Sequence, residues 1–216
     1  MIEIFDSKEQ SIAQLTQTNT AETSDYAQVV QEIIDTVRQN GDAALIDYSA
    51  KFDQATVTEL KVTDAEIEAA LAQVNPDFLK VLETAKNNIA EFHEKQISQG
   101  FMMTRNGAVM GQRVIPLAKV GIYVPGGTAA YPSTVLMNAV PAKIAGVKKI
   151  VLVTPPLQDG SVNPAILAAA KVAGVDEIYR VGGAQAVAAL AYGTESVPKV
   201  DKIVGPGNLS VAAATR

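Results

Sequence analysis

The sequence has no cysteine, no tryptophan and a single histidine, His93. Without cysteine the chain can form no disulfide framework, thiolate metal site or cysteine nucleophile. An ordinary zinc site needs several His, Cys, Asp or Glu ligands, and a Ser-His-Asp triad would have to use His93 without the usual G-x-S-x-G elbow. We therefore expect no catalytic residue and no metal ligand in the chain, and we interpret His93 as a solvated side chain on a helix.

Membrane and export signals are also lacking. No apolar run approaches the length of a membrane span. The start, Met1–Asp6, has no basic segment followed by an apolar stretch, so it does not resemble a secretion signal. No dense stripe of lysine and arginine with interleaved aromatic residues is present, which argues against nucleic acid as a partner. With 48% hydrophobic and 19% charged residues the composition is globular, and we expect a soluble cytoplasmic protein.

Charge is spread unevenly along the chain. The formal net charge is −5, but residues 119–216 carry +4 and residues 1–118 carry −9. A mildly basic second portion suits a phosphate-bearing ligand. The alternative is that its lysines are only solvated positions on helices and loops, and the sequence leaves the two interpretations open.

The second portion repeats one pattern four times: a hydrophobic run that breaks into a glycine or proline turn. The runs are Val120–Val124, Ile150–Val153, Ile178–Val181 and Lys202–Val204, and they start 30, 28 and 24 residues apart. Alanine-rich helical stretches fill the gaps, as in a parallel sheet wound by right-handed crossovers. We predict an α/β fold with a four-stranded, Rossmann-like parallel sheet. Ligands of such sheets bind outside the carboxyl ends of the strands, where these turns fall.

The first portion is predicted to be mainly helical. Gly41 is expected to end one helix, the pair Thr63 and Glu66 has the spacing of a capping box, and Asn75-Pro76 is expected to start a longer helix. Asn106-Gly107 between two apolar-rich runs predicts a β-hairpin. We place a boundary at 116–119, which divides the chain into a helical portion with a β-ribbon (1–118) and a Rossmann-like portion (119–216).

Three glycine turns are candidate ligand contacts: Pro125-Gly126-Gly127, Gly182-Gly183 and Gly205-Pro206-Gly207. Glycines permit close approach of a ligand, and amides at a following helix start can hold an anion. None completes the G-x-G-x-x-G or P-loop pattern, and each by itself is read as a structural turn. Three turns on one predicted edge favour a ligand site.

The amino-acid sequence of both portions resembles the histidinol dehydrogenase family, and the resemblance covers essentially all 216 residues. The strings that carry it are Asn40-Gly41-Asp42-Ala43-Ala44-Leu45, Tyr48-Ser49-Ala50-Lys51-Phe52-Asp53, Val120-Gly121-Ile122-Tyr123-Val124-Pro125-Gly126-Gly127, Pro132-Ser133-Thr134-Val135-Leu136-Met137, Gly182-Gly183-Ala184-Gln185-Ala186, the run from Gly193 to Ile203, and Gly205-Pro206-Gly207-Asn208.

The resemblance implies an NAD-dependent, zinc-requiring oxidation of L-histidinol to L-histidine, the last step of histidine biosynthesis. It also implies an aldehyde-dehydrogenase-like architecture of Rossmann-like halves and an intertwined homodimer. By motif, the residues that contact NAD in the family correspond to Tyr123, Gln185 and Asn208 of this chain.

The chain departs from the family in length. Family members are roughly twice as long, and their zinc ligands and Glu-His base pair lie beyond the point where this chain stops. The resemblance therefore implies an amino-terminal half, truncated and inactive alone. Two alternatives stay open: a non-catalytic nucleotide-binding or interaction module, and a βα domain whose glycine turns are only structural.

Overall fold

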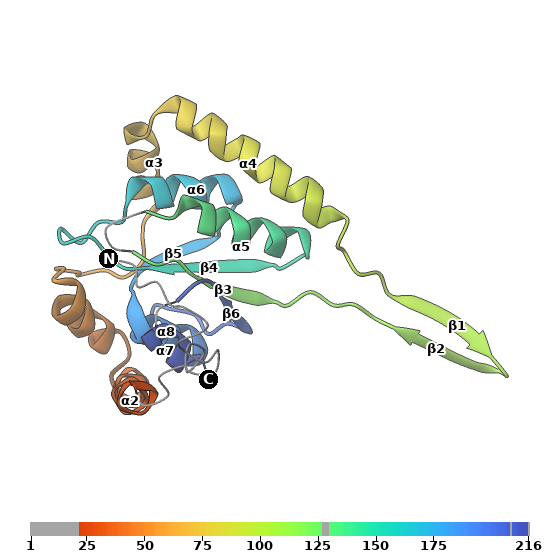
Figure 1. Ribbon diagram of the computed structural model, residues 1–216, viewed down its shortest axis with the longest axis horizontal. Helices are drawn as coiled ribbons and strands as arrows, with labels where there is room; N and C mark the ends of the chain where they lie inside the picture. The colour runs from red at the N-terminus through yellow and green to blue at the C-terminus, as the bar shows by residue number, and fades with distance from the viewer. Residues whose placement is uncertain (1–21, 127–129, 208, 216) are drawn as a thin grey trace, which may run out of the picture.

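The computed structural model describes residues 22–126, 130–207 and 209–215, and Figure 1 shows their arrangement. The helices are α2 (Glu22–Tyr48), the π-helical turn η1 (Ser49–Asp53), α3 (Asp64–Gln73), α4 (Pro76–Glu94), α5 (Pro132–Ile144), α6 (Pro164–Ala173), α7 (Gly183–Tyr192) and α8 (Leu209–Ala214). The strands are β1 (Phe101–Arg105), β2 (Ala108–Gln112), β3 (Lys119–Tyr123), β4 (Lys149–Thr154), β5 (Glu177–Arg180) and β6 (Lys202–Val204).

The four predicted strands form one parallel sheet in the order β5-β4-β3-β6. Val120 of β3 lies opposite Ile150 of β4 on one side and Lys202 of β6 on the other. The chain thus moves outward from β3 to β5 and then crosses back through α7 to the other side of β3. This confirms the predicted α/β class, and it places the reversal of strand order between β3 and β6, where open α/β sheets form their ligand crevice.

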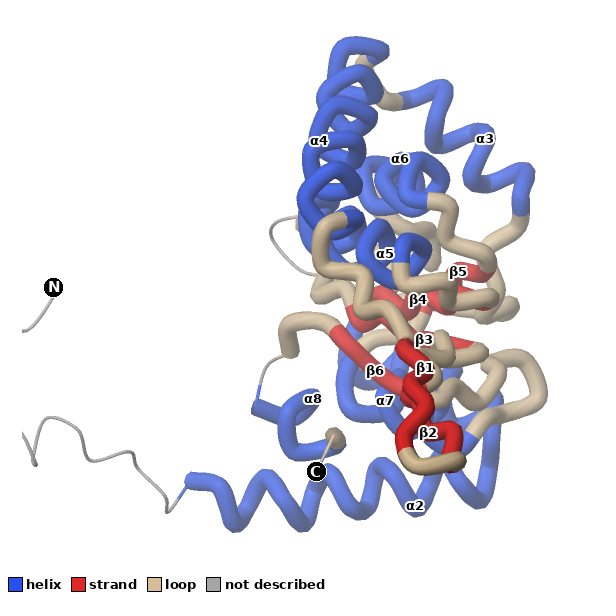
Figure 2. The backbone as a smooth tube through the Cα atoms, turned by 90° about the vertical axis from the view of Figure 1, so that its right-hand side faces the viewer, coloured by secondary structure: helices blue, strands red, loops and turns tan. Residues whose placement is uncertain are grey.

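Helices cover both faces of the sheet, as Figures 1 and 2 show. Alternate strand residues point to opposite faces, so Val151 and Val153 pack with α2, α7 and α8, whereas Ile150 and Leu152 pack with α3 to α6. A Cβ at Gly121 would lie 2.8 Å from Leu190 Cδ1, so the absent side chain lets α7 lie close on β3. Each fully buried aliphatic side chain contributes about 1.5–3 kcal/mol, so both faces stabilise the sheet.

The first portion supplies helices to both faces. α2 packs on α7 and α8, and α3 and α4 pack on α5 and α6. The helix break predicted at Gly41 is a kink within α2, where Gly41 has φ 54°. Here Asp42 accepts hydrogen bonds from Thr194 Oγ1 (2.5 Å) and the Ser196 amide (3.3 Å), which ties α2 to the loop after α7. The boundary proposed at 116–119 stays a prediction.

The two local signals for helix α3 and the ribbon are confirmed. Thr63 Oγ1 accepts from the Glu66 amide at 3.3 Å, and Glu66 Oε2 accepts from the Thr63 amide at 2.8 Å, which completes the capping box. β1 and β2 pair antiparallel around Asn106 and Gly107, whose φ angles of 50° and 78° suit a tight hairpin turn. The ribbon extends away from the rest of the chain, and all ten strand residues are exposed.

The outer edge of β5 is covered by residues 60–62, which the sequence analysis did not foresee. The Val62 amide donates to the Ile178 carbonyl at 2.9 Å, and the Arg180 amide donates to the Leu60 carbonyl at 2.8 Å. This antiparallel pairing satisfies backbone groups that an open edge would leave exposed. No helix in the described ranges is long and apolar enough to cross a membrane.

Candidate functional site

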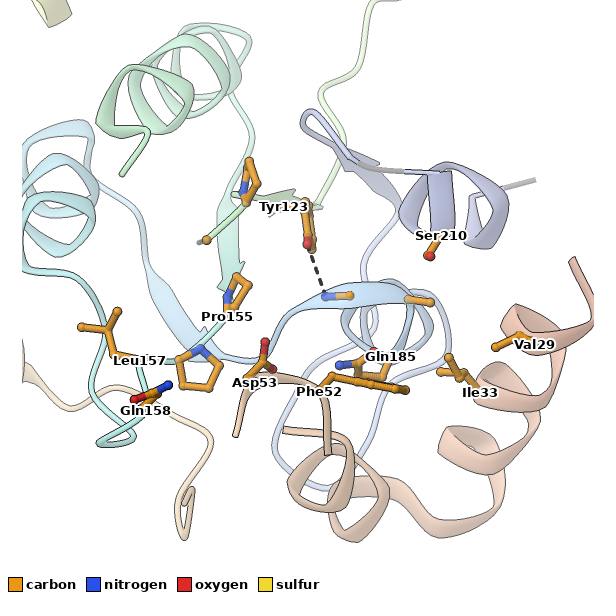
Figure 3. Close-up of a pocket in the computed structure, with 15 residues that line it drawn as sticks. Val29, Ile33, Phe52, Asp53, Tyr123, Pro155, Leu157, Gln158, Gln185 and Ser210 are labelled. Atoms are coloured by element: carbon orange, nitrogen blue, oxygen red, sulfur yellow. Dashed lines mark hydrogen bonds between the residues drawn. The ribbon is translucent and has the colours of Figure 1, made fainter. Parts of the chain in front are cut away.

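A pocket of about 860 Å³ lies where the carboxyl ends of β3, β4 and β5 meet α2, η1 and α8 (Figure 3). It adjoins the point at which the strand order reverses, so its place agrees with the edge predicted from the glycine turns. The residues that line it are Val29, Ile33, Phe52, Asp53, Tyr123, Pro125, Gly126, Pro155, Pro156, Leu157, Gln158, Gly183, Ala184, Gln185 and Ser210.

Tyr123 is the last residue of β3 and lines this pocket with only 5% of its surface exposed. Its hydroxyl accepts a hydrogen bond from the Gly183 amide at 3.3 Å, which links the end of β3 to the start of α7. Burial raises the pKa of Tyr123, the bond from Gly183 opposes this, and the charge of Asp53 adds to the increase. The phenol therefore stays neutral and keeps its O–H as a donor.

Gln185 lies in the first turn of α7, lines the pocket and is 2% exposed. Glycine is required at Gly183, the first residue of α7, because its φ is 64° and an added Cβ would lie 2.5 Å from Gln185 Oε1. Gly183 and Ala184, the first two residues of α7, line the pocket as well, and the Gly183 amide donates to the Tyr123 hydroxyl. A helix start carries partial positive charge and unpaired N–H donors, so this wall can hold an anionic group beside an amide side chain.

The wall between the strand ends is built from prolines and glycines. A Cβ at Gly126 would lie 3.0 Å from Pro155 Cγ, and one at Gly182 would overlap the same ring. Both glycine turns therefore pack against Pro155, which follows β4. Absent side chains and a rigid ring leave the space at the strand ends open for a ligand.

The structure brings together two of the three residues predicted to contact a nucleotide. Tyr123 and Gln185 line the same pocket although 62 positions separate them in the sequence. Asn208 lies outside the described residues. Ser210, on α8 just after it, lines the pocket. The assignment of these residues to a nucleotide stays a prediction.

Asp53 and Phe52 are pocket residues that sequence reasoning did not single out. Both belong to η1, the π-helical turn that follows α2, and π-helical turns occur often at functional sites. Burial raises the pKa of Asp53 from 3.8 to about 6. Both residues belong to the string from Tyr48 to Asp53, which is one of those that carry the family resemblance. No local pattern in that string predicts that it lies beside the end of β3.

The described residues do not fit a zinc ion. Within the ranges that the structure describes, no group of three or more His, Cys, Asp and Glu side chains comes together. His93 lies on α4, where its Nδ1 is 2.7 Å from Gln96 Oε1. α4 packs against α5 and α6, across the sheet from α2 and α7 (Figure 1). The histidine thus lies away from the pocket lining.

Comparisons with known proteins agree on one family. The family model described as histidinol dehydrogenase matches residues 16–216. The histidinol dehydrogenase of Clostridium acetobutylicum is 59% identical over 196 residues, which cover 90% of this chain and 46% of the relative. That of Lactococcus lactis is 51% identical over 216 residues, with 98% and 50% covered. The crystal structure of histidinol dehydrogenase from Elizabethkingia anophelis superimposes with a TM-score of 0.83 at 38% identity, covering 92% of this chain and 48% of that one.

The chain spans about half the length of the curated relatives it matches. The match extends over both portions, from residue 16 to residue 216. On the family model, the sequence identities and the shared fold together, this chain belongs to the histidinol dehydrogenase family.

Proposed function

We propose that this chain forms the NAD-binding part of a histidinol dehydrogenase, and that the whole protein oxidises L-histidinol to L-histidine in the cytoplasm as the last step of histidine biosynthesis. The observation that carries the proposal is the pocket at the carboxyl ends of β3, β4 and β5, where Tyr123, Gln185 and the start of α7 meet. We infer the reaction from family membership, and we assign the binding of its cofactor to this pocket.

The chemistry of the pocket suits a dinucleotide. The Gly183 amide at the start of α7 donates to the Tyr123 hydroxyl, but the positive end of this helix still favours a diphosphate at the pocket. The side chains of Tyr123 and Gln185 offer hydrogen-bond donors and acceptors beside it. Val29, Ile33 and Phe52 form an apolar wall against which a planar base can pack. When bound, NAD supplies the group that accepts a hydride from the substrate. Tyr123, Gln185 and, by family motif, Asn208 are the residues we assign to holding it.

Substrate oxidation also needs a base and, in this family, a zinc ion. The donor set in the described part of this chain does not fit zinc, and we assign no step to it here. We assign metal binding and proton abstraction to residues of the whole protein outside the described pocket, and we infer a homodimer from family membership. By itself the chain is then a nucleotide-binding module without oxidising activity.

Titration of the purified chain with NAD, followed by calorimetry or NMR, tests the proposal. We expect NAD to bind wild type, and Gln185→Ala to weaken binding by about 1–3 kcal/mol, because it removes one or two hydrogen bonds from a buried contact. Tyr123→Phe, which keeps the ring, serves as a second variant. No NADH should form from histidinol with added zinc.

Gln73→Ala is a suitable control, because this exposed glutamine ends α3 on the other face of the sheet. Its affinity for NAD should equal that of wild type. Equal affinities in wild type, Gln185→Ala and Tyr123→Phe, or spectral changes confined to residues outside the pocket lining, would contradict the proposed site.

A further inference from the structure

Asp53 has an unusual position for a carboxylate. Its Oδ2 is buried, and no hydrogen-bond partner for it occurs in the described part of the chain. A buried carboxylate oxygen without a donor is costly, and such groups are normally paired. Asp53 nevertheless lines the wall of an open pocket rather than the interior of a core. Since the described part of the chain offers this oxygen no donor, a ligand in the pocket is a natural source of hydrogen bonds for it.

The surroundings of Asp53 indicate which end of a dinucleotide it faces. Asp53 directly follows Phe52, whose ring stacks on Tyr48 at a centroid distance of 5.4 Å and is half exposed. In Figure 3 the carboxylate of Asp53 points toward the side of the pocket that holds the Tyr123 hydroxyl, and Phe52 lies beside it. A base that packs on the apolar wall of Val29, Ile33 and Phe52 would bring the sugar attached to it next to Asp53.

The charge of the pocket wall points to a neutral, hydroxyl-bearing group. Among the described lining residues Asp53 is the one carboxylate, and none of them is a lysine, arginine or histidine. Lys51 places its Nζ 5.3 Å from the centroid of Phe52 but does not line the pocket. An ionised carboxylate accepts hydrogen bonds from vicinal hydroxyls and repels a phosphate at the same place.

We infer that Asp53 accepts hydrogen bonds from the ribose hydroxyls at the adenosine end of the dinucleotide and sets the preference for NAD over its 2′-phosphorylated form, NADP. This inference rests on the proposed function, because it concerns the same pocket and the same cofactor class. In many dinucleotide sites a carboxylate at the end of a later sheet strand holds these hydroxyls. Here the carboxylate comes from η1, before the sheet begins in the sequence.

The inference is tested by measuring the affinities of wild type and Asp53→Asn for NAD and for NADP by calorimetry. Wild type should bind NAD more tightly than NADP. The variant should lose affinity for NAD by roughly tenfold or more, as expected for a lost hydrogen bond to a charged group. Its affinity for NADP should stay constant or rise, so that the ratio of the two affinities falls by at least about tenfold.

Asp47→Asn is the matched control, since Asp47 is an exposed carboxyl on α2 that does not line the pocket, and it should leave both affinities unchanged. Thermal unfolding of each variant verifies the folded state, and Asp53→Ala provides a second substitution without an amide. If wild type binds NAD but Asp53→Asn and Asp53→Ala keep its NAD/NADP ratio, the role of Asp53 is wrong while the proposed function stands. If wild type binds neither nucleotide, both proposals fail.

Discussion

Replacing Asp53 by asparagine should favour the folded chain more at neutral pH than at low pH, because at neutral pH the pocket holds the native carboxylate ionised in poorly solvating surroundings. Burial raises the pKa of Asp53 from 3.8 to about 6. The folded state therefore binds a proton more tightly than the unfolded state. As the pH rises from about 4 to about 6 the folded chain loses this advantage, and above that window the ionised group lowers the free energy of unfolding.

The size of the effect follows from the shift. A difference of one pKa unit corresponds to about 1.4 kcal/mol, so the full shift sets an upper limit of about 3 kcal/mol. The carboxylate lies at a pocket that water reaches, and solvent screening reduces the expected gain to on the order of 1–2 kcal/mol. The amide of asparagine brings its own buried donors, whose cost is the same at every pH. The pH-dependent part of the difference therefore isolates the charge.

Urea unfolding followed by circular dichroism, at several values between about pH 4.5 and about pH 7.5, measures this difference. The free energy of unfolding of Asp53→Asn, relative to wild type, should rise with pH through the window and level off above about pH 6. Asp47→Asn makes the same charge change on an exposed position of α2 and should stay within about 0.5 kcal/mol of wild type throughout. Parallel curves for wild type and Asp53→Asn would refute the reasoning, since they would show that the folded chain does not penalise the ionised carboxylate.

Two further predictions concern contacts at the ends of strands β3 and β5. Gly205, with φ 130°, faces the carbonyl oxygen of Tyr123, which an added Cβ would overlap, so Gly205→Ala should destabilise the chain by about 3 kcal/mol or more, measured by urea unfolding. Gly107 is the control, because it has φ 78° but no atom lies within 4 Å of an added Cβ. Gly107→Ala should lower the free energy of unfolding by only about 1–2 kcal/mol. Equal losses of stability in the two variants would exclude the clash as the cause. Burial by itself would raise the pKa of Glu66, but hydrogen bonds with Thr63 and Arg180 outweigh burial and lower it. Glu66→Gln should therefore reduce the free energy of unfolding by about 1–2 kcal/mol at neutral pH. That cost should shrink as the pH falls below 4.5, the ordinary pKa of the group, and a cost that stays constant down to low pH would contradict an ionic contribution.

Local signals in the sequence were sufficient for the elements and their class. The capping box at Thr63, the start of α4 at Pro76 and the hairpin turn at Asn106-Gly107 depend on a few neighbouring residues, and the structure has all three. The spacing of the hydrophobic runs also predicted a parallel sheet, because a strand, a turn and a covering helix need about 30 residues. The sequence pattern thus determined which residues form strands and at which ends the glycine turns lie.

Only the tertiary structure decided which of those turns share a pocket and what completes it. Spacing does not specify the order β5-β4-β3-β6, which depends on α7 crossing back over the opposite face of the sheet. Nor does it place η1, and with it Asp53, beside Tyr123 some 70 positions later. Contacts between residues so far apart are set by how α2 packs on α7, through the side chains that both helices bury. Burial of an apolar face is non-directional, so a sequence pattern shows that a helix must pack but not which strand ends it will meet.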